Sequence, residues 1–293
     1  MNRKDKIFQI VLCVIFCVLC ILIVFPFWLL ISASLSDSAV LAAKGYQIWP
    51  NPIDFSSYAY VFKHPEQIMR AYGVTFVFSV VTMVLSVLLM AMIAYPISQR
   101  DFKAKNAVNF YLYFTMLFSG GLVPTYIVVA KLLHLNDTLW AYILPGLISP
   151  WYVFMMRTFF QGIPAEIMES ATIDGASEYT VFFKMILPLS KTVLATVALF
   201  YALTYWNDWY LALLYIDNDK LLNLQSLLQR ILKNIALLNS AEAINSGMVS
   251  QTDIPTEGVR MAMCIIAAGP MLVVFPFFQK YFVQGLTVGS VKG

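Results

Sequence analysis

Charged residues are scarce in this sequence. They make up 12% of the chain, against about a quarter in an average soluble protein, whereas hydrophobic residues make up 60%. Mean hydropathy is correspondingly high, at +0.75. This composition excludes an ordinary soluble domain and indicates an integral membrane protein, in which most of the chain is spent on spanning segments.

Residues suited to catalysis or metal binding are also few. The chain has two histidines and four cysteines. Cys13, Cys17 and Cys20 form a helical stripe without histidine or carboxylate neighbours, which favours packing over a metal site. No glycine-rich loop precedes Lys191-Thr192, so the phosphate-binding loop of an ATPase is excluded. We therefore expect no enzyme activity, no metal and no cofactor on this chain.

What the sequence does contain is a series of long apolar stretches, each about long enough to cross the hydrocarbon core of a bilayer. They are 7–31, 71–97, 107–133, 139–160, 189–216 and 259–282. The third stretch is interrupted by Ser119, Gly120, Gly121 and Pro124, which predicts a kinked helix there rather than two short ones. The sequence therefore predicts a single all-α domain over 1–293 with six transmembrane helices.

The distribution of Lys and Arg predicts the orientation of these helices. Basic residues gather before the first stretch, between the second and third, between the fourth and fifth, and near the C-terminus. Because short cytoplasmic loops carry an excess of Lys and Arg, both termini and the loop 161–188 are expected in the cytoplasm. The first apolar run is too long for a signal peptide, so we expect an uncleaved helix.

The loop 161–188 has the pattern of a helix, a glycine elbow and a second helix. Apolar residues recur at helical spacing, while Glu169 and Asp174 take the other side. Gly175 can adopt the left-handed conformation that ends a helix, and Ser177 can cap the next one. A simple connection needs none of this, so the pattern predicts a cytoplasmic knob that fits into another protein. A helix lying on the lipid headgroups is the alternative.

The same loop resembles a known motif. Glu169-Ser170-Ala171, Gly175, Met185 and Leu187-Pro188 follow the spacing of the EAA motif of ABC importer permeases, with Ser170 and Met185 as mild departures. Four further stretches resemble the carbohydrate-uptake, maltose-type branch of these permeases, and in particular its LplC or YtcP type. They are 135–145, 156–177, 205–216 and 279–293.

This resemblance implies a type I ABC importer permease in a bacterial cell membrane, which provides half of a translocation path. The implied partners are a second homologous permease, two ATPase subunits that carry ATP and Mg, an extracellular solute-binding protein, an oligosaccharide and membrane lipid, with no nucleic acid. The residues that would couple the chain to an ATPase are Glu169, Ser170, Ala171, Asp174, Gly175 and Pro188. The tail that would reach towards the ATPases is Gly289, Ser290, Val291, Lys292 and Gly293.

A polar group within the fifth apolar stretch suggests where substrate passes. Trp206, Asn207, Asp208 and Trp209 place a carboxylate and an amide among aromatic rings near the outer end of that stretch. An ionisable residue within a membrane is costly and therefore a functional hypothesis, and these side chains suit the hydroxyls and apolar faces of a sugar. The alternative is that the polar pair bonds to neighbouring helices and that the tryptophans belong to the interfacial belt.

Trp151 and Tyr152 in the fourth stretch are secondary candidates for lining the path, although packing is the more economical explanation. Because Asp208 would disfavour acidic sugars at the mouth of the path, we expect a neutral oligosaccharide. Uronate-containing glycans or another small solute are the alternative, and a free-standing secondary transporter is the rival class. Between the last two stretches, an apolar stripe at helical spacing predicts an extracellular amphipathic helix over about 221–236.

Overall fold

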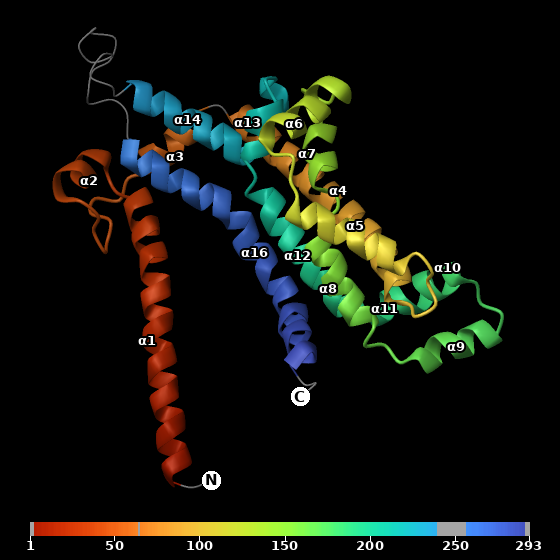
Figure 1. Ribbon diagram of the computed structural model, residues 1–293. Coiled ribbons are helices and arrows are strands. Elements are labelled where there is room, and N and C mark those ends of the chain that lie inside the picture. The colour runs from red at the N-terminus through yellow and green to blue at the C-terminus, as the bar shows by residue number, and fades with distance from the viewer. Residues whose placement is uncertain (1–2, 64, 239–255, 291–293) are drawn as a thin grey trace. The chain divides into compact units, whose positions relative to one another are not determined.

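The computed structural model describes residues 3–63, 65–238 and 256–290, and helices make up nearly all of the regular structure in these ranges (Figure 1). A lone antiparallel bridge pairs Ser36 with Ile53. The chain divides into two compact units. The first comprises Met1–Ile68 with Leu228–Pro270, and the second comprises Met69–Leu227 with Met271–Gly293.

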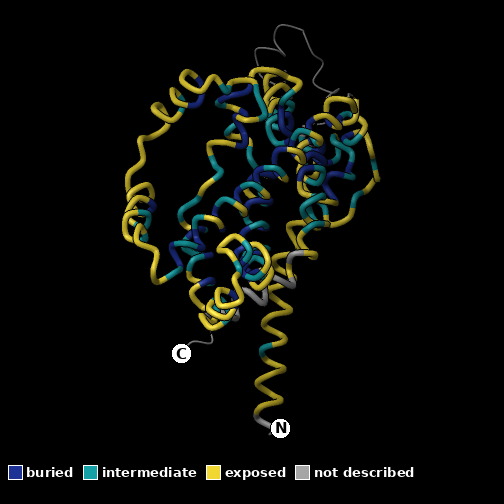
Figure 2. The backbone as a smooth tube through the Cα atoms, turned by 90° about the vertical axis from the view of Figure 1, so that its right-hand side faces the viewer, coloured by how far each residue is buried: buried dark blue, intermediate teal, exposed yellow. Residues whose placement is uncertain are grey.

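The first unit is dominated by one long helix. Its elements are α1 (Arg3–Ser34), α2 (Ser38–Lys44), α3 (Ser56–Val61), the first turn of α4 (Pro65–Ser98), most of α14 (Leu224–Leu238) and the first part of α16 (Thr256–Ser290). Near the end of α1, the Trp28 indole donates a hydrogen bond to the Ile48 carbonyl at 2.9 Å and packs edge-on against Trp49. No residue in the apolar window of α1 is buried, and Figure 2 shows this helix exposed along nearly all its length.

The second unit holds the main core. It includes most of α4, the first turn of α14 and the last part of α16. Its other elements are α5 (Lys105–Leu117), α6 (Leu122–Tyr126), η1 (Ile127–Leu132), α7 (Trp140–Ile143), η2 (Leu144–Gly146), α8 (Pro150–Phe160), α9 (Ala165–Ile173), α10 (Glu178–Val181), η3 (Phe182–Ile186), α11 (Leu187–Leu189), α12 (Lys191–Trp206), α13 (Tyr210–Tyr215) and η4 (Asp219–Leu221). Helices α8 and α12 lie side by side (Figure 1). Phe78 of α4 stacks on Tyr142 at 4.5 Å and meets Tyr205 edge-on, so aromatic packing joins α4, α7 and α12.

Three described helices are long and apolar enough to cross a membrane. They are Asp5–Ser34, Pro65–Ser98 and Glu257–Phe277, which coincide with the first, second and sixth expected stretches. Two bent pairs of helices pass the same test of length and composition when each pair is taken together. They are Lys105–Leu117 with Leu122–Leu132, and Glu178–Leu189 with Lys191–Trp206. Several apolar helices are therefore present.

The prediction of a kinked helix over 107–133 is wrong. The stretch forms two helices whose axes differ by 114°, with the break at 118–121. Phe118 is extended and Gly121 has a φ of +85°, a left-handed conformation that favours glycine. Consecutive residues without helical dihedral angles interrupt the hydrogen-bond ladder completely, which a single kink does not.

The fourth and fifth stretches are also not continuous helices. Within 139–160, Ser149 is extended and α8 starts at Pro150. Proline disfavours helical geometry in the preceding residue and suits the first position of a new helix, which explains the break. Within 189–216, helix α12 ends at Trp206 and α13 begins at Tyr210. The second break falls on the polar group proposed from the sequence.

The stretch of about 221–236, where an amphipathic helix was predicted, corresponds to α14, which begins at Leu224. Leu224, Leu227 and Leu228 of its apolar stripe are buried, whereas Arg230 and Lys233 are exposed. The period of 3.6 residues in the sequence was therefore sufficient to predict the helix and its apolar face, while the packing of that face within the chain was not predicted.

Candidate functional site

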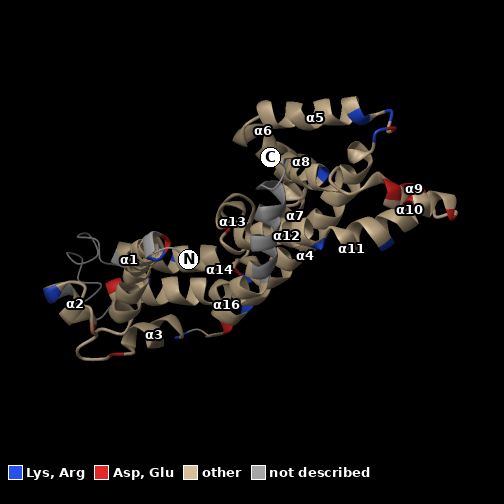
Figure 3. Cartoon of the chain, turned by 90° about the horizontal axis from the view of Figure 1, so that it is seen from below, with Lys and Arg blue, Asp and Glu red and all other residues tan. Residues whose placement is uncertain are grey.

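Helix α9 carries apolar residues on one side and carboxylates on the other. Ala171 is buried and Ile167 and Met168 are half-buried, while Glu166 and Glu169 are exposed. Figure 3 shows acidic residues on α9. An amphipathic helix is therefore present in the loop 161–188, where helical spacing predicted one. Its acidic side remains accessible to a partner.

The glycine elbow after α9 is also confirmed. Gly175 has a φ of +81°, and its N–H donates to the Thr172 carbonyl at 3.0 Å, while the Ala176 N–H donates to the Ala171 carbonyl at 2.9 Å. These two bonds form the Schellman arrangement, in which a left-handed residue satisfies the last carbonyls of a helix. The chain therefore turns at Gly175 with its backbone groups paired.

The second helix of the loop begins as predicted. The Ser177 hydroxyl accepts the Thr180 N–H at 3.3 Å, with Glu178 in the first turn of α10. Glu178 in turn accepts a hydrogen bond from the Tyr95 hydroxyl of α4 at 2.8 Å. No local pattern in the sequence indicates this bond, because the two residues lie far apart in the chain. It ties the elbow to α4.

A π-helical turn, η3, precedes the Leu-Pro pair at the end of the motif. Pro188 has no N–H and its ring would clash with the Lys184 carbonyl in a regular α-helix, so a wider turn relieves the conflict. Beyond Ser190, helix α12 departs at 77°. The motif thus ends in a sharp change of direction.

Two apolar side chains of the loop are conspicuously exposed. Ile173 is 86% exposed and Tyr179 is 76% exposed, on either side of the elbow. Ile173 lies one turn beyond Glu169, so the two share a face of α9. Exposed apolar groups of this size, close to charged ones, are typical of a protein interface. Their exposure depends on the tertiary fold, and the helical pattern did not single them out.

The remaining predicted coupling residues fall in and beyond this loop. Ser170 and Asp174 are exposed, and the Asp174 N–H donates to the Ser170 carbonyl at 3.1 Å. Gly289 and Ser290 end helix α16, and nothing further is described for their side chains. The rest of the predicted tail, 291–293, lies outside the described residues.

The polar pair of the fifth stretch is engaged with nearby backbone. The Asp208 carboxylate accepts the Leu211 N–H at 3.1 Å in the first turn of α13, and the Asn207 amide donates to the Leu203 carbonyl at 2.8 Å. The Asn223 amide donates to the Asp208 carbonyl oxygen. Asn207 is exposed and Asp208 is half-buried. Asp208 therefore has a local structural role, which leaves its predicted role in substrate passage as a proposal.

The two tryptophans of this segment differ in environment. Trp206 is 5% exposed and its ring lies 6.1 Å from that of Tyr72, whereas Trp209 is 41% exposed and packs edge-on against Tyr210. Trp206 is therefore a core residue, whereas Trp209 is accessible to other molecules.

The secondary candidates also differ. Trp151 is 65% exposed, whereas Tyr152 is half-buried and lines a cavity of about 260 Å³. The cavity is lined by Gly146, Ser149, Tyr152, Tyr201, Thr204 and Tyr205. None of the four residues from Trp206 to Trp209 lines it, so the structure does not bring all the predicted path residues into one site.

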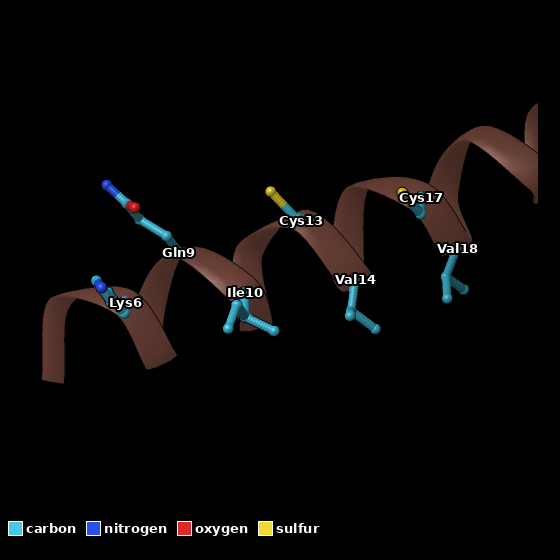
Figure 4. A pocket seen from close by; sticks show the side chains of 7 residues that line it. All are labelled: Lys6, Gln9, Ile10, Cys13, Val14, Cys17 and Val18. Carbon is cyan, nitrogen blue, oxygen red and sulfur yellow. The ribbon is translucent and has the colours of Figure 1, made fainter. Parts of the chain in front are cut away.

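A larger hollow of about 530 Å³ lies along α1, where Lys6, Gln9, Ile10, Cys13, Val14, Cys17 and Val18 line it (Figure 4). All seven side chains come from this one helix, so no second element encloses a ligand. Among the described residues, no group of three or more His, Cys, Asp or Glu side chains could hold a metal ion.

A helical membrane chain with a loop of two helices joined at a glycine elbow is the architecture of an ABC importer permease. Residues 70–288 match the family model described as the binding-protein-dependent transport system inner membrane component, and this chain belongs to that family. It is a transport permease of the cell membrane and not an enzyme. In such systems the permease works with an ATPase and a solute-binding protein.

Two curated relatives extend the similarity over nearly the whole chain. Protein LplC of Bacillus subtilis (strain 168) is 41% identical over 270 residues, covering 92% of this chain and 90% of LplC. The polygalacturonan/rhamnogalacturonan transport system permease protein YtcP of the same strain is 35% identical over 290 residues, covering 99% of this chain and all of YtcP.

A solved structure gives the same result for the fold. One chain in the crystal structure of a bacterial ABC transporter involved in the import of the acidic polysaccharide alginate superimposes with a TM-score of 0.80. It is 28% identical in sequence, and the match covers 96% of this chain and 99% of that one. The ABC importer permease fold expected from the motif is therefore confirmed.

Proposed function

We propose that this chain is one of two permease subunits of an ATP-driven importer of oligosaccharides, and that its α9 elbow docks one ATPase subunit. The observation that carries the proposal is the loop itself, in which a Schellman turn at Gly175 presents an exposed acidic and apolar face on α9. In the intact importer, Glu169 and Ile173 would contact the ATPase, and the C-terminal tail 289–293 would approach the ATPase pair.

The elbow is suited to transmit movement. Ala171 anchors α9 to the core, and the Tyr95–Glu178 bond ties α10 to α4. ATP binding can change the direction of opening only if the ATPases bind the two permease conformations with different affinities. Because α9 and α10 are both fixed to the rest of the unit, a movement of the bound ATPase can be transmitted through the loop to the membrane helices.

We propose a membrane topology of six spans with both termini in the cytoplasm. Helices α1, α4 and α16 supply three spans, and the two bent pairs supply the third and fifth. The segment from α7 to α8 would supply the fourth, because Leu147 and Tyr152, on either side of its break at Ser149, pack against the core of the second unit. Irregular backbone at membrane depth is tolerated where protein or water meets its polar groups.

For the substrate, we propose oligosaccharides that contain uronic acids. The names of YtcP and of the alginate importer refer to polymers of acidic sugars, which supports this alternative for a chain so similar to both. The argument for a neutral sugar rested on the charge of Asp208. That carboxylate is bound to the N–H of Leu211, so backbone dipoles partly offset its charge.

The experiment that tests the proposed function is purification of the chain from its native membrane in mild detergent, followed by uptake in proteoliposomes. We expect one different permease and two ATPase copies to accompany it, and ATP-dependent uptake of trigalacturonate once the binding protein is added. Maltotriose serves as the neutral comparison. A chain that purifies alone and transports without ATP would contradict the proposal and support a secondary transporter.

A further inference from the structure

The second unit contains a tyrosine-lined cavity, and none of its lining residues belongs to the loop 161–188. It lies where η2 ends and α8 begins, against the face of α12 that carries Tyr201, Thr204 and Tyr205. Its six lining residues include no charged side chain. The groups that they offer are the hydroxyls of serine, threonine and tyrosine, together with aromatic rings.

One wall of the cavity depends on a glycine. A β-carbon at position 146 would overlap the Tyr205 hydroxyl, so only glycine allows this tyrosine to pack against η2. The Tyr201 hydroxyl donates to the Gly146 carbonyl at 3.2 Å, and the Tyr201 and Tyr205 rings stack at 5.6 Å. Tyr152 completes the wall, with its ring 5.4 Å from that of Tyr201. The wall is therefore held in place before any ligand arrives.

The cavity also has an opening. Tyr201 and Tyr205 are buried, whereas Thr204 is exposed, so the hollow is accessible from the Thr204 side. Asn207 lies about one turn beyond Thr204 and is also exposed. A sugar that contacts the Asn207 amide is thus one helical turn away from the cavity.

Size and chemistry limit what the cavity can hold. Its volume of about 260 Å³ falls just below the roughly 300 to 1,000 Å³ of pockets for drug-sized ligands. It accommodates one small unit and not a whole oligosaccharide. Neutral hydroxyl groups beside aromatic faces suit a polar ring with an apolar side. A buried carboxylate would lack a cationic partner, so the carboxylate of a uronate ring would lie at the exposed Thr204 side of the cavity.

We propose that this cavity is a subsite for a single pyranose ring of the transported oligosaccharide, bound through its hydroxyls and not through a carboxylate. The inference rests on the proposed function. Thr204 of α12 and Ser149 at the start of α8 supply hydrogen bonds from two different segments, and Tyr152 covers the apolar face of the ring. As the oligosaccharide leaves the binding protein, its rings would enter the subsite one after another.

The test uses the assembled importer in proteoliposomes with saturating, sugar-loaded binding protein. The sugar is trigalacturonate or maltotriose, whichever the wild-type complex imports. Thr204→Val removes one hydroxyl while keeping the side-chain shape, and Ser149→Ala removes one from the other segment. The matched control is Thr196→Val on the same helix, whose hydroxyl bonds to the Thr192 carbonyl and does not line the cavity. Sugar imported and ATP hydrolysed are measured together.

We expect the two cavity variants to import about three- to tenfold less sugar per ATP, the effect of losing one hydrogen bond, with ATPase stimulation and complex assembly unchanged. The control should match the wild type. If both cavity variants import as much sugar per ATP as the wild type, the proposed subsite is contradicted. A parallel fall in import and ATPase activity also overturns it, because that result indicates a packing role. If the wild-type complex imports neither sugar, the proposed function itself fails.

Discussion

At the scale of single residues, Gly175 shows why backbone geometry can matter more than space. Nothing lies within 4 Å of the position that a β-carbon would occupy there, yet φ is +81°. Residues other than glycine, asparagine and aspartate rarely adopt this left-handed backbone conformation, which costs an L-residue about 1 to 2 kcal/mol of conformational free energy. The requirement for glycine thus arises from the turn itself.

Gly175→Val should therefore abolish coupling without removing the chain from the membrane. We expect stimulated ATPase activity in proteoliposomes to fall at least about tenfold, since valine must leave the left-handed region and open the elbow. Gly175→Asn should retain most activity, because asparagine tolerates this φ. Gly73→Ala, at a helical site with open space, is the control. Wild-type stimulation in the valine variant would show that the elbow is not needed.

Local signals explain which residues of the loop could be predicted. Gly175 and Ser177 satisfy backbone groups of their own helices, so capping rules alone identify them. The exposure of Ile173 and the bond between Tyr95 and Glu178 depend on how distant segments pack. No pattern within the loop contains that information.

At the scale of elements, hydropathy predicted where apolar segments lie and failed to predict their continuity. A sum over a window counts apolar residues and contains no information on the direction of the chain. The residues at 119–124 indicated a kink, but the complete break and the 114° bend were not predicted. The same applies to the breaks at Ser149 and 207–209. The sequence contains local signals for the first two breaks, in paired glycines and in Pro150. At such positions, glycine pairs and prolines are better indicators of a break than the hydropathy averaged over a window.

One carboxylate joins two such elements outside the coupling loop. The Asp137 Oδ1 accepts the N–H groups of both Asp217 and Asn218 at 2.7 Å, and the Asp137 N–H donates to the Tyr215 carbonyl at 2.9 Å. Asp137 also has a φ of +53°. The loop before α7 is thereby fixed to the end of α13.

Asp137→Ala should release this connection. We expect amide hydrogen exchange over 215–221 to accelerate on the order of tenfold in the purified complex, because two hydrogen bonds to a charged acceptor are lost. Asp137→Asn should stay close to the wild type, since its amide oxygen can accept both N–H groups and asparagine tolerates the positive φ. Asp217→Ala removes a neighbouring carboxylate while keeping its N–H, and should have no effect. Unchanged exchange in Asp137→Ala would contradict the role given to this residue.

At the scale of the whole molecule, the chain leaves much apolar surface for other molecules to cover. Leu117, Leu132 and Phe110 are among many large side chains that are mostly exposed, as are most residues of α1. In a soluble protein such a surface would cause aggregation, whereas here it matches lipid and partner subunits. Composition alone therefore predicted the environment correctly, while the family and its similarity to sugar permeases came from spaced motifs.

The six-span topology can be tested by labelling in intact cells. In a chain whose four cysteines are replaced by alanine, a membrane-impermeant maleimide should label Lys63→Cys, and it should label Lys103→Cys only after permeabilisation. The reason is that one span, α4, separates the two exposed positions. The cysteine-free chain is the control. Labelling of both positions, or the reverse pattern, would contradict the proposed orientation.

The hydrogen bond between Tyr95 and Glu178 has a mechanical consequence. From Tyr95 back to Met69, helix α4 is continuous and extends roughly 40 Å at 1.5 Å per residue. A helix of this kind is stiff along its axis, so a force applied to the elbow displaces a rod and does not need to refold a loop. If the elbow docks an ATPase as proposed, one phenol and one carboxylate convert a push at the elbow into a movement at the far end of α4.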